Sequence, residues 1–136
     1  MRTKANATLI ALAFAAGSVM FSAPAASAAA YCSGSGWTAT NEPMERCTSL
    51  DNGILYNKQI SGSTIYTTYS KTGGSTISAK LGYIHSGTTT YAAAVSIASG
   101  QTVKKSFSVS SGWYCDSIIG VMSANGTKYQ TPATHC

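Results

Sequence analysis

Acidic side chains are scarce in this sequence. The 136 residues include only four, namely Glu42, Glu45, Asp51 and Asp116. Catalysis by paired carboxylates needs two acids that converge on one bond. Glu42 and Glu45 lie three residues apart, so one helical turn would place both on the same side. We interpret them as a solvated pair and not as a catalytic acid and base.

Clusters of basic side chains are also missing. Beyond position 28 there are seven basic residues and four acids, a net charge of +3, and apart from Lys104-Lys105 the cations are dispersed singly. A nucleic-acid-binding surface gathers Lys and Arg on one face. The sequence therefore predicts no nucleic-acid partner, and we interpret the lysines as solvated surface.

The motifs of catalytic and metal-binding sites are missing as well. His85 and His135 stand in no H-x-H, H-E-x-x-H or G-x-S-x-G context. A Ser-His-Asp triad that uses Asp51 or Asp116 stays open, because triads assemble in space and not in sequence. We expect a protein that is not an enzyme and that carries no cofactor and no metal.

No apolar run is long enough to span a bilayer. The longest covers positions 7–21, short of the ~20 residues that a spanning helix needs. Arg2 and Lys4 precede it, and the A-x-A sequence Ala26-Ser27-Ala28 follows. We interpret residues 1–28 as a secretory signal peptide and expect a secreted, extracellular protein without a membrane partner after cleavage. A membrane anchor is the alternative interpretation.

Four cysteines lie beyond this leader: Cys32, Cys47, Cys115 and Cys136. An even number in an oxidising compartment implies disulfides. We favour Cys32 with Cys47 and Cys115 with Cys136, because cysteines that are neighbours in sequence pair with the smallest loss of chain entropy. A zinc site is the alternative, but the cysteines have no C-x-x-C spacing.

From Asn52 onward, short alternating runs are separated by turn pairs such as Ser86-Gly87 and Asn125-Gly126. This pattern is typical of a sandwich or barrel. It predicts an all-β fold, a single disulfide-stabilised antiparallel β-sandwich of about seven strands over residues 52–136. The expected strands are Ile54–Ile60, Thr64–Lys71, Thr76–His85, Tyr91–Ile97, Val103–Val109, Trp113–Met122 and Lys128–Thr131.

Alternation assigns a face to each side chain, because successive residues of a strand point to opposite sides. We expect the second and third strands to form a hairpin in which Thr72 lies opposite Thr76. The side chains expected to point inward are Ile65, Thr67, Tyr69, Ile77, Ala79, Leu81, Tyr83, Tyr91, Ala93, Val95, Ile97, Val103, Phe107 and Val109. Lys105 falls on the same side, which predicts either an edge position or a bulge.

The segment before this region has no sustained period. We interpret residues 29–51 as an irregular N-terminal arm, with Asn41 capping one helical turn through Glu45. The first disulfide would hold the arm against the sandwich.

Tyrosine and tryptophan are the richest recognition signal, because they bury a large area and keep a polar group. Trp113 adjoins Cys115, and we expect it to pack in the core. Tyr114 has the opposite parity, and Trp37 lies in the arm together with Met44 and Arg46. We predict Trp37, Met44, Arg46 and Tyr114 as partner-binding residues. Covering a sheet edge is the alternative role of the arm.

Several stretches resemble small secreted actinomycete proteins: Tyr69-Ser70-Lys71-Thr72-Gly73-Gly74-Ser75, Leu81-Gly82-Tyr83, Ser99-Gly100-Gln101-Thr102, and the tail Tyr129-Gln130-Thr131-Pro132 that ends in Cys136. Within that group the chain is similar to the β-sandwich adaptor subunit of extracellular umbrella toxin particles. That adaptor links a repeat-bearing toxin polypeptide to lectin subunits. The resemblance implies a non-enzymatic adaptor in a toxin complex.

The chain also resembles the proteinaceous α-amylase inhibitors of actinomycetes, which are small sandwiches with two sequential disulfides. Their inhibitory Trp-Arg-Tyr triplet is absent, because Trp113-Tyr114 has no arginine between the rings. We therefore expect a secreted protein-binding module whose partner is an extracellular protein. Inhibition of a secreted hydrolase and carbohydrate binding are the alternatives.

Overall fold

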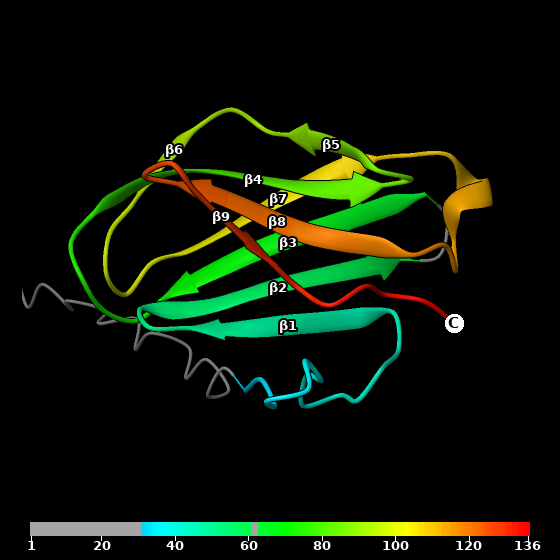
Figure 1. Cartoon of the computed structure of the whole chain (residues 1–136), viewed down its shortest axis with the longest axis horizontal. Coiled ribbons are helices and arrows are strands. Elements are labelled where there is room, and N and C mark those ends of the chain that lie inside the picture. Colours follow the sequence, from blue (N-terminus) through cyan, green and yellow to red (C-terminus); the bar gives the residue numbers. More distant parts are fainter. Residues whose placement is uncertain (1–30, 61–62) are drawn as a thin grey trace, which may run out of the picture.

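The computed structural model describes residues 31–60 and 63–136, and in this part nine strands form two antiparallel sheets (Figure 1). One sheet has the order β1-β2-β3-β7. The other has the order β5-β4-β8-β9, and β6 pairs with β4 as well. The strands are β1 Glu45–Leu50, β2 Gly53–Ile60, β3 Thr64–Lys71, β4 Ile77–His85, β5 Thr88–Tyr91, β6 Val95–Ile97, β7 Thr102–Ser108, β8 Ile118–Ala124 and β9 Thr127–Gln130. The expected all-β class is confirmed.

Two of the expected turn pairs form tight hairpins. Ser86-Gly87 joins β4 to β5 with φ of 48° and 77°, and Asn125-Gly126 joins β8 to β9 with φ of 51° and 75°. Positive φ at both central residues matches the right-handed twist of the flanking strands. Glycine adopts this conformation without steric cost, so these dipeptides determine where the strands reverse.

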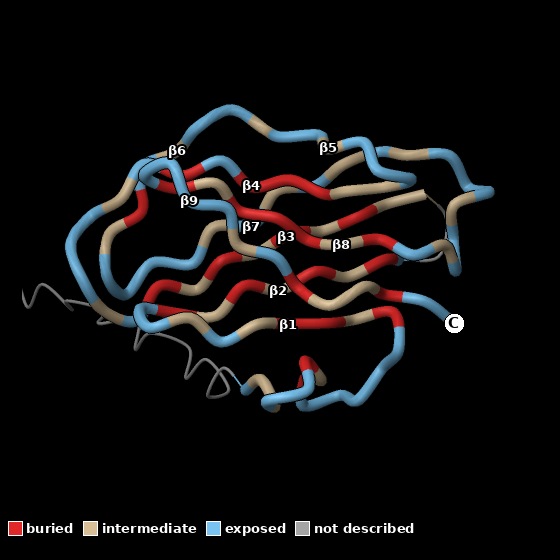
Figure 2. Tube along the Cα trace, viewed as in Figure 1, coloured by how far each residue is buried: buried red, intermediate tan, exposed pale blue. Residues whose placement is uncertain are grey.

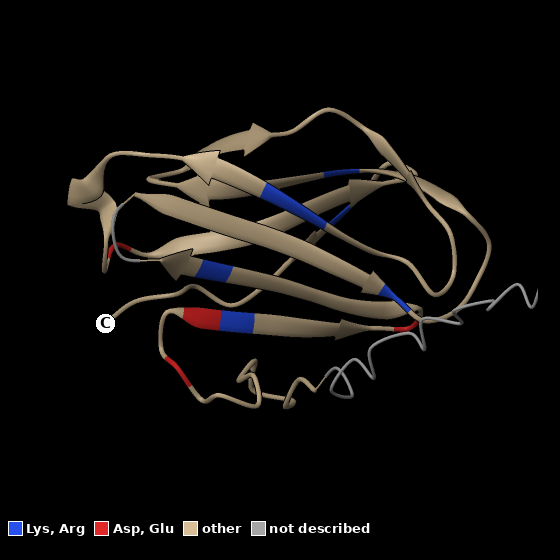
Figure 3. Ribbon diagram, turned by 180° about the vertical axis from the view of Figure 1, so that it is seen from behind, with Lys and Arg blue, Asp and Glu red and all other residues tan. Residues whose placement is uncertain are grey.

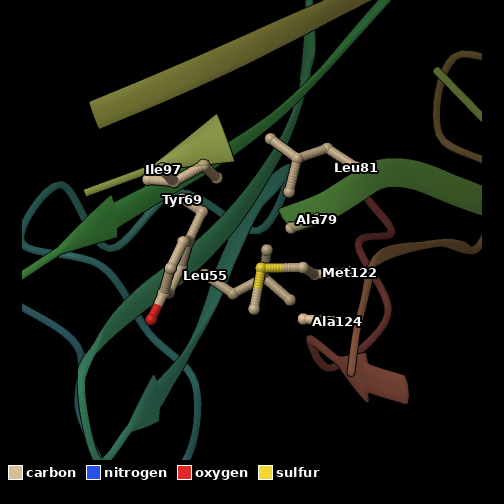
Figure 4. Close-up of a cluster of buried hydrophobic side chains, with 7 residues drawn as sticks. All are labelled: Leu55, Tyr69, Ala79, Leu81, Ile97, Met122 and Ala124. Carbon is tan, nitrogen blue, oxygen red and sulfur yellow. The ribbon is translucent and has the colours of Figure 1, made fainter. Parts of the chain in front are cut away.

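The two sheets pack face to face in a sandwich-like arrangement, and two clusters of buried apolar side chains lie between them. The main cluster takes Leu55 and Tyr69 from the first sheet and Ala79, Leu81, Ile97, Met122 and Ala124 from the second (Figure 4). Burial alternates along β2 and β3, as Figure 2 shows. The expected inward positions Ile65, Thr67, Tyr69, Ala79, Leu81 and Tyr83 are confirmed as buried.

Polar side chains also lie between the sheets. Thr67 Oγ1 donates to the Gly82 carbonyl across the sheets at 2.8 Å, and it accepts from Asn57 Nδ2 at 3.2 Å. Gln59 Nε2 donates to the Asp116 carbonyl and to Thr134 Oγ1, both at 2.7 Å. Buried polar groups are stable where they are hydrogen-bonded, so these amides and hydroxyls fasten one sheet to the other.

The predicted hairpin of the second and third strands is wrong. β3 matches the expected range Thr64–Lys71, but it pairs with β2 and β7, whereas β4 pairs with β5, β6 and β8. The Gly73-Gly74-Ser75 segment therefore connects the two sheets. The inward faces of β3 and β4 were still assigned correctly, because facing sheets of a sandwich point their apolar residues at each other just as hairpin strands share a face.

Two other expected strands are also corrected. The segment 91–97 is not one strand, because β5 and β6 pair separately with β4, and Tyr91 and Ala93 are exposed. The segment 113–122 begins outside the sheet. Ser111–Trp113 forms a single 3-10 turn, η1, and β8 starts only at Ile118.

The expected irregular arm over residues 29–51 is wrong in its second half. Glu45–Leu50 is strand β1, which pairs along its full length with β2. The expected helical turn after Asn41 is a hydrogen-bonded turn, in which Glu45 N–H donates to the Glu42 carbonyl at 3.0 Å, and Glu45 then begins the strand. β-branched and aromatic residues are rare in β1, so the sequence gives little strand signal there.

The predicted disulfides, Cys32 with Cys47 and Cys115 with Cys136, are both present. Lys105 lies on the inner side of β7, an edge strand whose pairing with β3 runs without interruption. The edge position is thus confirmed, and the alternative of a bulge is wrong. The predicted signal peptide, residues 1–28, lies outside the described residues. No described helix is long and apolar enough to cross a membrane.

Candidate functional site

Arg46, one of the four predicted contact residues, is committed to the fold. Its side chain is only 9% exposed. Nε donates to the Gly36 carbonyl at 3.1 Å and Nη2 to the Ser35 carbonyl at 3.2 Å. The guanidinium carbon lies 4.1 Å from the centre of the Trp37 ring, a cation–π contact. Arg46 therefore holds the first residues of the described chain against the β1 edge, and Trp37 lies half-buried on top of it.

Met44 is likewise buried, at 7% exposure. Its carbonyl accepts from Gln59 N–H at 3.0 Å, and its sulfur lies 3.8 Å from the sulfur of Cys136. Tyr114 is 44% exposed and follows η1 directly. The bridge from Cys115 to Cys136 brings Tyr114 to the end of the molecule where Met44 lies. Of the four predicted residues, Tyr114 and part of Trp37 are accessible to a partner.

The outer side of the sheet β1-β2-β3-β7 carries a group of large side chains that was not predicted from the sequence. We call it the tyrosine face and define it by Glu45, Tyr56, Lys58, Ile60, Tyr66, Thr68 and Lys104, which line a shallow depression of about 420 Å³. These positions alternate with the inward residues of β2, β3 and β7, so they must point outward. Figure 3 views the sheet from this side, and no described element crosses in front of β2 and β3 there.

Register explains how these side chains meet. Tyr56 lies opposite Thr68, and Thr68 opposite Lys104. Lys58 lies opposite Glu45 on one side and Tyr66 on the other. The Lys104 ammonium is 4.6 Å from the centre of the Tyr66 ring. The face therefore forms one continuous row across four strands.

The charges of the tyrosine face are largely paired within the protein. Lys58 Nζ lies 3.2 Å from a carboxylate oxygen of Glu42 and 3.2 Å from one of Glu45. Desolvation opposes the charged form of Lys58, but the hydrogen bonds to Glu45 and Glu42 outweigh it, so the pKa of Lys58 is raised. Burial, with a smaller effect of the Glu45 charge, also raises the pKa of Tyr56. The face thus presents the neutral phenol of Tyr56 and an internally paired lysine.

A second cleft lies where β4 ends, and it joins a histidine to an aspartate. His85 Nε2 is 2.9 Å from Asp116 Oδ2, and the Trp113 ring stacks on the imidazole with 3.7 Å between the ring centres. Trp113 packs against the cluster of Ile65, Tyr83 and Ile118 but is only half-buried. We expected it to pack in the core, and it lies at the margin of this cluster. The sequence allowed a triad with Asp116, and the structure does bring this acid to a histidine.

The cleft does not supply an aligned nucleophile. Ser86 and Ser117 line it, in a volume of about 440 Å³. Within the described chain neither hydroxyl is hydrogen-bonded to the His85 ring, although a nucleophilic serine must reach its base. Among residues 31–60 and 63–136, no three His, Cys, Asp or Glu side chains converge on a point where a metal could bind. The hydrogen bond between His85 and Asp116 connects the loop before β8 to the end of β4.

Comparison with known proteins adds no relative. No family model, no curated protein and no solved structure matches the chain. The contacts of the described residues therefore carry the functional argument.

Proposed function

We propose that this protein is a secreted, non-enzymatic module that binds other extracellular proteins, and that the tyrosine face is the main contact surface. The observation that carries this proposal is the uncovered row of Tyr56, Tyr66 and Ile60 around a lysine whose charge is already paired. Tyrosines combine a large apolar area with a hydroxyl, and they dominate the binding energy of many protein interfaces.

The charge pattern favours a protein partner over a polyanion. Lys58 is held by Glu42 and Glu45, which leaves Lys104 as the one unpaired cation among the residues that define the face. A nucleic acid or another polyanion is bound by clustered cations, and the tyrosine face has none. Interfaces between proteins instead enclose aromatic anchors within a polar rim, which describes the two tyrosines and the residues around them.

Trp37 and Tyr114 would offer further contact areas beyond the tyrosine face, since both keep accessible rings. Met44 and Arg46 would support these contact areas without touching the partner. The buried Arg46 side chain fixes the chain beneath Trp37, and the buried Met44 side chain packs near Cys136. An adaptor that joins two subunits of an extracellular toxin assembly needs such separate contact areas. Inhibition of a secreted hydrolase would use the same surfaces with an enzyme as partner.

The experiment begins with capture from native culture fluid by the tagged protein. The captured protein is identified by mass spectrometry, purified, and titrated with wild-type and variant chains. The Tyr56→Ala, Tyr66→Ala double variant should bind at least about tenfold more weakly, a loss of ~1.4 kcal/mol that is modest for two interface tyrosines. The matched control is Tyr91→Ala, an exposed tyrosine on β5 of the opposite sheet, which should bind within about twofold of wild type.

Other outcomes would redirect the proposal. Undiminished binding by the folded double variant would remove the tyrosine face from the interface. Retention of the wild type on a polysaccharide, without a protein partner, would identify a carbohydrate-binding protein. Turnover of a polymer by the purified chain would show that it is an enzyme, and loss of that turnover in His85→Ala would place the reaction in the second cleft.

A further inference from the structure

Lys71, at the end of β3, is a buried charge without a charged partner. Its side chain is 2% exposed, and its Nζ donates to the Gly73 carbonyl. All four acids of the sequence lie among the described residues, yet no ion pair there includes Lys71. An ammonium has more donors than one carbonyl can accept, and buried charges are normally paired.

A cavity of about 330 Å³ adjoins this lysine. Its lining residues come from the end of β3 and from the β1–β2 and β8–β9 turns. In Figure 1 these segments lie at the end of the molecule opposite the labelled C-terminus. In Figure 3 the blue tip of β3 lies beside the red turn after β1, which holds Asp51. None of the residues that line this cavity belongs to the tyrosine face.

The backbone around Lys71 is fixed before any ligand arrives. Lys71 N–H donates to the Gln101 carbonyl at 2.9 Å, and its own carbonyl accepts from Gly100 N–H at 2.8 Å. Asn52, from the β1–β2 turn, accepts from Thr72 N–H at 2.8 Å through its carbonyl. Turns from three connections thus hold the backbone at Lys71 in place, and preorganisation of a site lowers the entropic cost of binding.

The cavity walls combine aromatic rings with polar groups. The lining residues include two tyrosines, Tyr69 and Tyr129, and the polar residues Asp51, Asn52 and Asn125. Figure 4 shows the Tyr69 hydroxyl directed away from the aliphatic side chains of the core cluster. Burial, and to a smaller degree Tyr129, raises the pKa of Tyr69, so this phenol remains a hydrogen-bond donor.

We propose that this cavity binds a small hydroxylated carboxylate of the sugar-acid class, with its carboxylate paired to Lys71. The ammonium supplies the charge that an anion requires. The Asp51 and asparagine side chains accept and donate hydrogen bonds as vicinal hydroxyls need, and the tyrosine rings pack on the apolar face of a sugar ring. The volume lies at the lower end of the range of small-molecule sites.

The test is a titration of the full secreted chain, with its disulfides intact, by D-glucuronate and by D-glucose. The two probes share a ring and differ in the carboxylate, so the difference between their affinities measures the contribution of that carboxylate. We expect saturable shifts of amide NMR signals from residues 49–52, 69–73 and 122–129 with glucuronate, and at least about tenfold weaker binding of glucose, the factor given by ~1.4 kcal/mol.

Lys71→Met removes the ammonium and keeps the length of the side chain, and apolar replacement of a buried charge is often neutral for stability. This variant should bind glucuronate no better than glucose. Lys80→Met, an exposed lysine on β4, is the matched control and should bind like wild type. Asn125→Gly, at an exposed turn position with φ of 51°, keeps the left-handed conformation and removes the side-chain amide. It should weaken both probes, and it provides a second variant if Lys71→Met fails to fold.

Absence of saturable shifts with glucuronate in the folded wild type would overturn the proposal, as would equal affinity of wild type and folded Lys71→Met. Equal binding of glucose and glucuronate would also contradict it, because the carboxylate would then be unused. The Tyr56→Ala, Tyr66→Ala variant should retain glucuronate binding, so failure of the cavity and failure of the tyrosine face give different results.

Discussion

At the scale of single residues, alternation of side chains determines most of what is buried. Leu81 is fully buried in the core cluster, whereas its neighbour Lys80 is exposed. The same period puts Tyr69 inside and Tyr66 outside on β3. Side chains on the inner side of a strand therefore contribute to stability, whereas those on its outer side are accessible to a partner.

Leu81→Ala should lower the free energy of unfolding by roughly 2 to 5 kcal/mol, because truncation of a buried leucine leaves a cavity. Lys80→Ala should change it by about 0.5 kcal/mol or less, as is usual for exposed positions. Urea titrations of both variants against wild type measure the difference. A larger effect at Lys80 than at Leu81 would contradict the register of β4.

Gly120→Ala should destabilise the protein by roughly 1 to 3 kcal/mol, the usual cost of overpacking. A Cβ at Gly120 on β8 would overlap the side chain of Asn57 on β2, which is itself fully buried. Gly112→Ala, in η1, is the control, since its Cβ would meet no atom closer than 3.7 Å. Equal thermal midpoints of the two variants would show that the sheets can move apart at Gly120 without cost.

The raised pKa of Tyr69 predicts a specific loss of stability at high pH. The folded state retains the phenol proton more strongly than the unfolded chain, whose tyrosines ionise near pH ~10. The stabilisation is fully present below that pH and is lost as the pH rises through the folded-state pKa. Urea titrations at increasing pH should show a smaller decline for Tyr69→Phe than for wild type. Parallel declines would assign the effect to other groups, with Tyr56 as the first alternative.

At the scale of elements, the two disulfides hold unlike parts of the structure. Cys47 lies in β1 and is fully buried, whereas Cys115 lies in an exposed loop before β8. From the sequence, the bridge from Cys115 to Cys136 is expected to matter more, because Cys115 falls in the predicted core strand Trp113–Met122. That premise is wrong, since β8 begins at Ile118.

We therefore expect the opposite order of stabilities. The chain-entropy contribution of each bridge is similar, about 3 kcal/mol for loops of this size. Loss of the first bridge also empties a fully buried site in β1. The Cys32→Ala, Cys47→Ala variant should unfold at a lower temperature than the Cys115→Ala, Cys136→Ala variant. A lower midpoint for the second pair would show that the C-terminal segment contributes more than β1.

At the scale of the whole molecule, we expect the two sheets to unfold as one cooperative unit. The main cluster contains residues of both sheets, and hydrogen bonds from Thr67 and Gln59 join them. Thermal unfolding with intact disulfides should give coincident transitions by far-UV circular dichroism and by tryptophan fluorescence. Trp113 reports on the packed end near Tyr83, and Trp37 on the β1 edge. Two separated transitions would show that the β1 edge opens independently.

Local features of the amino-acid sequence predicted the all-β class, most of the inward faces, two of the tight turns and the disulfide partners. These features are local. Alternation follows from strand geometry, and positive φ favours particular residues. Cysteines close in sequence pair with a small loss of chain entropy. The sequence did not show β1, because its residues have little strand propensity and it is stabilised by pairing with β2.

Long-range packing sets which strands become neighbours, since a hairpin and a crossover between facing sheets bury the same side chains. It also decided the sites. The tyrosine face gathers residues from β1, β2, β3 and β7, and the cavity beside Lys71 gathers the ends of strands far apart in sequence. Long-range register and packing bring these side chains together, and no local pattern records that juxtaposition.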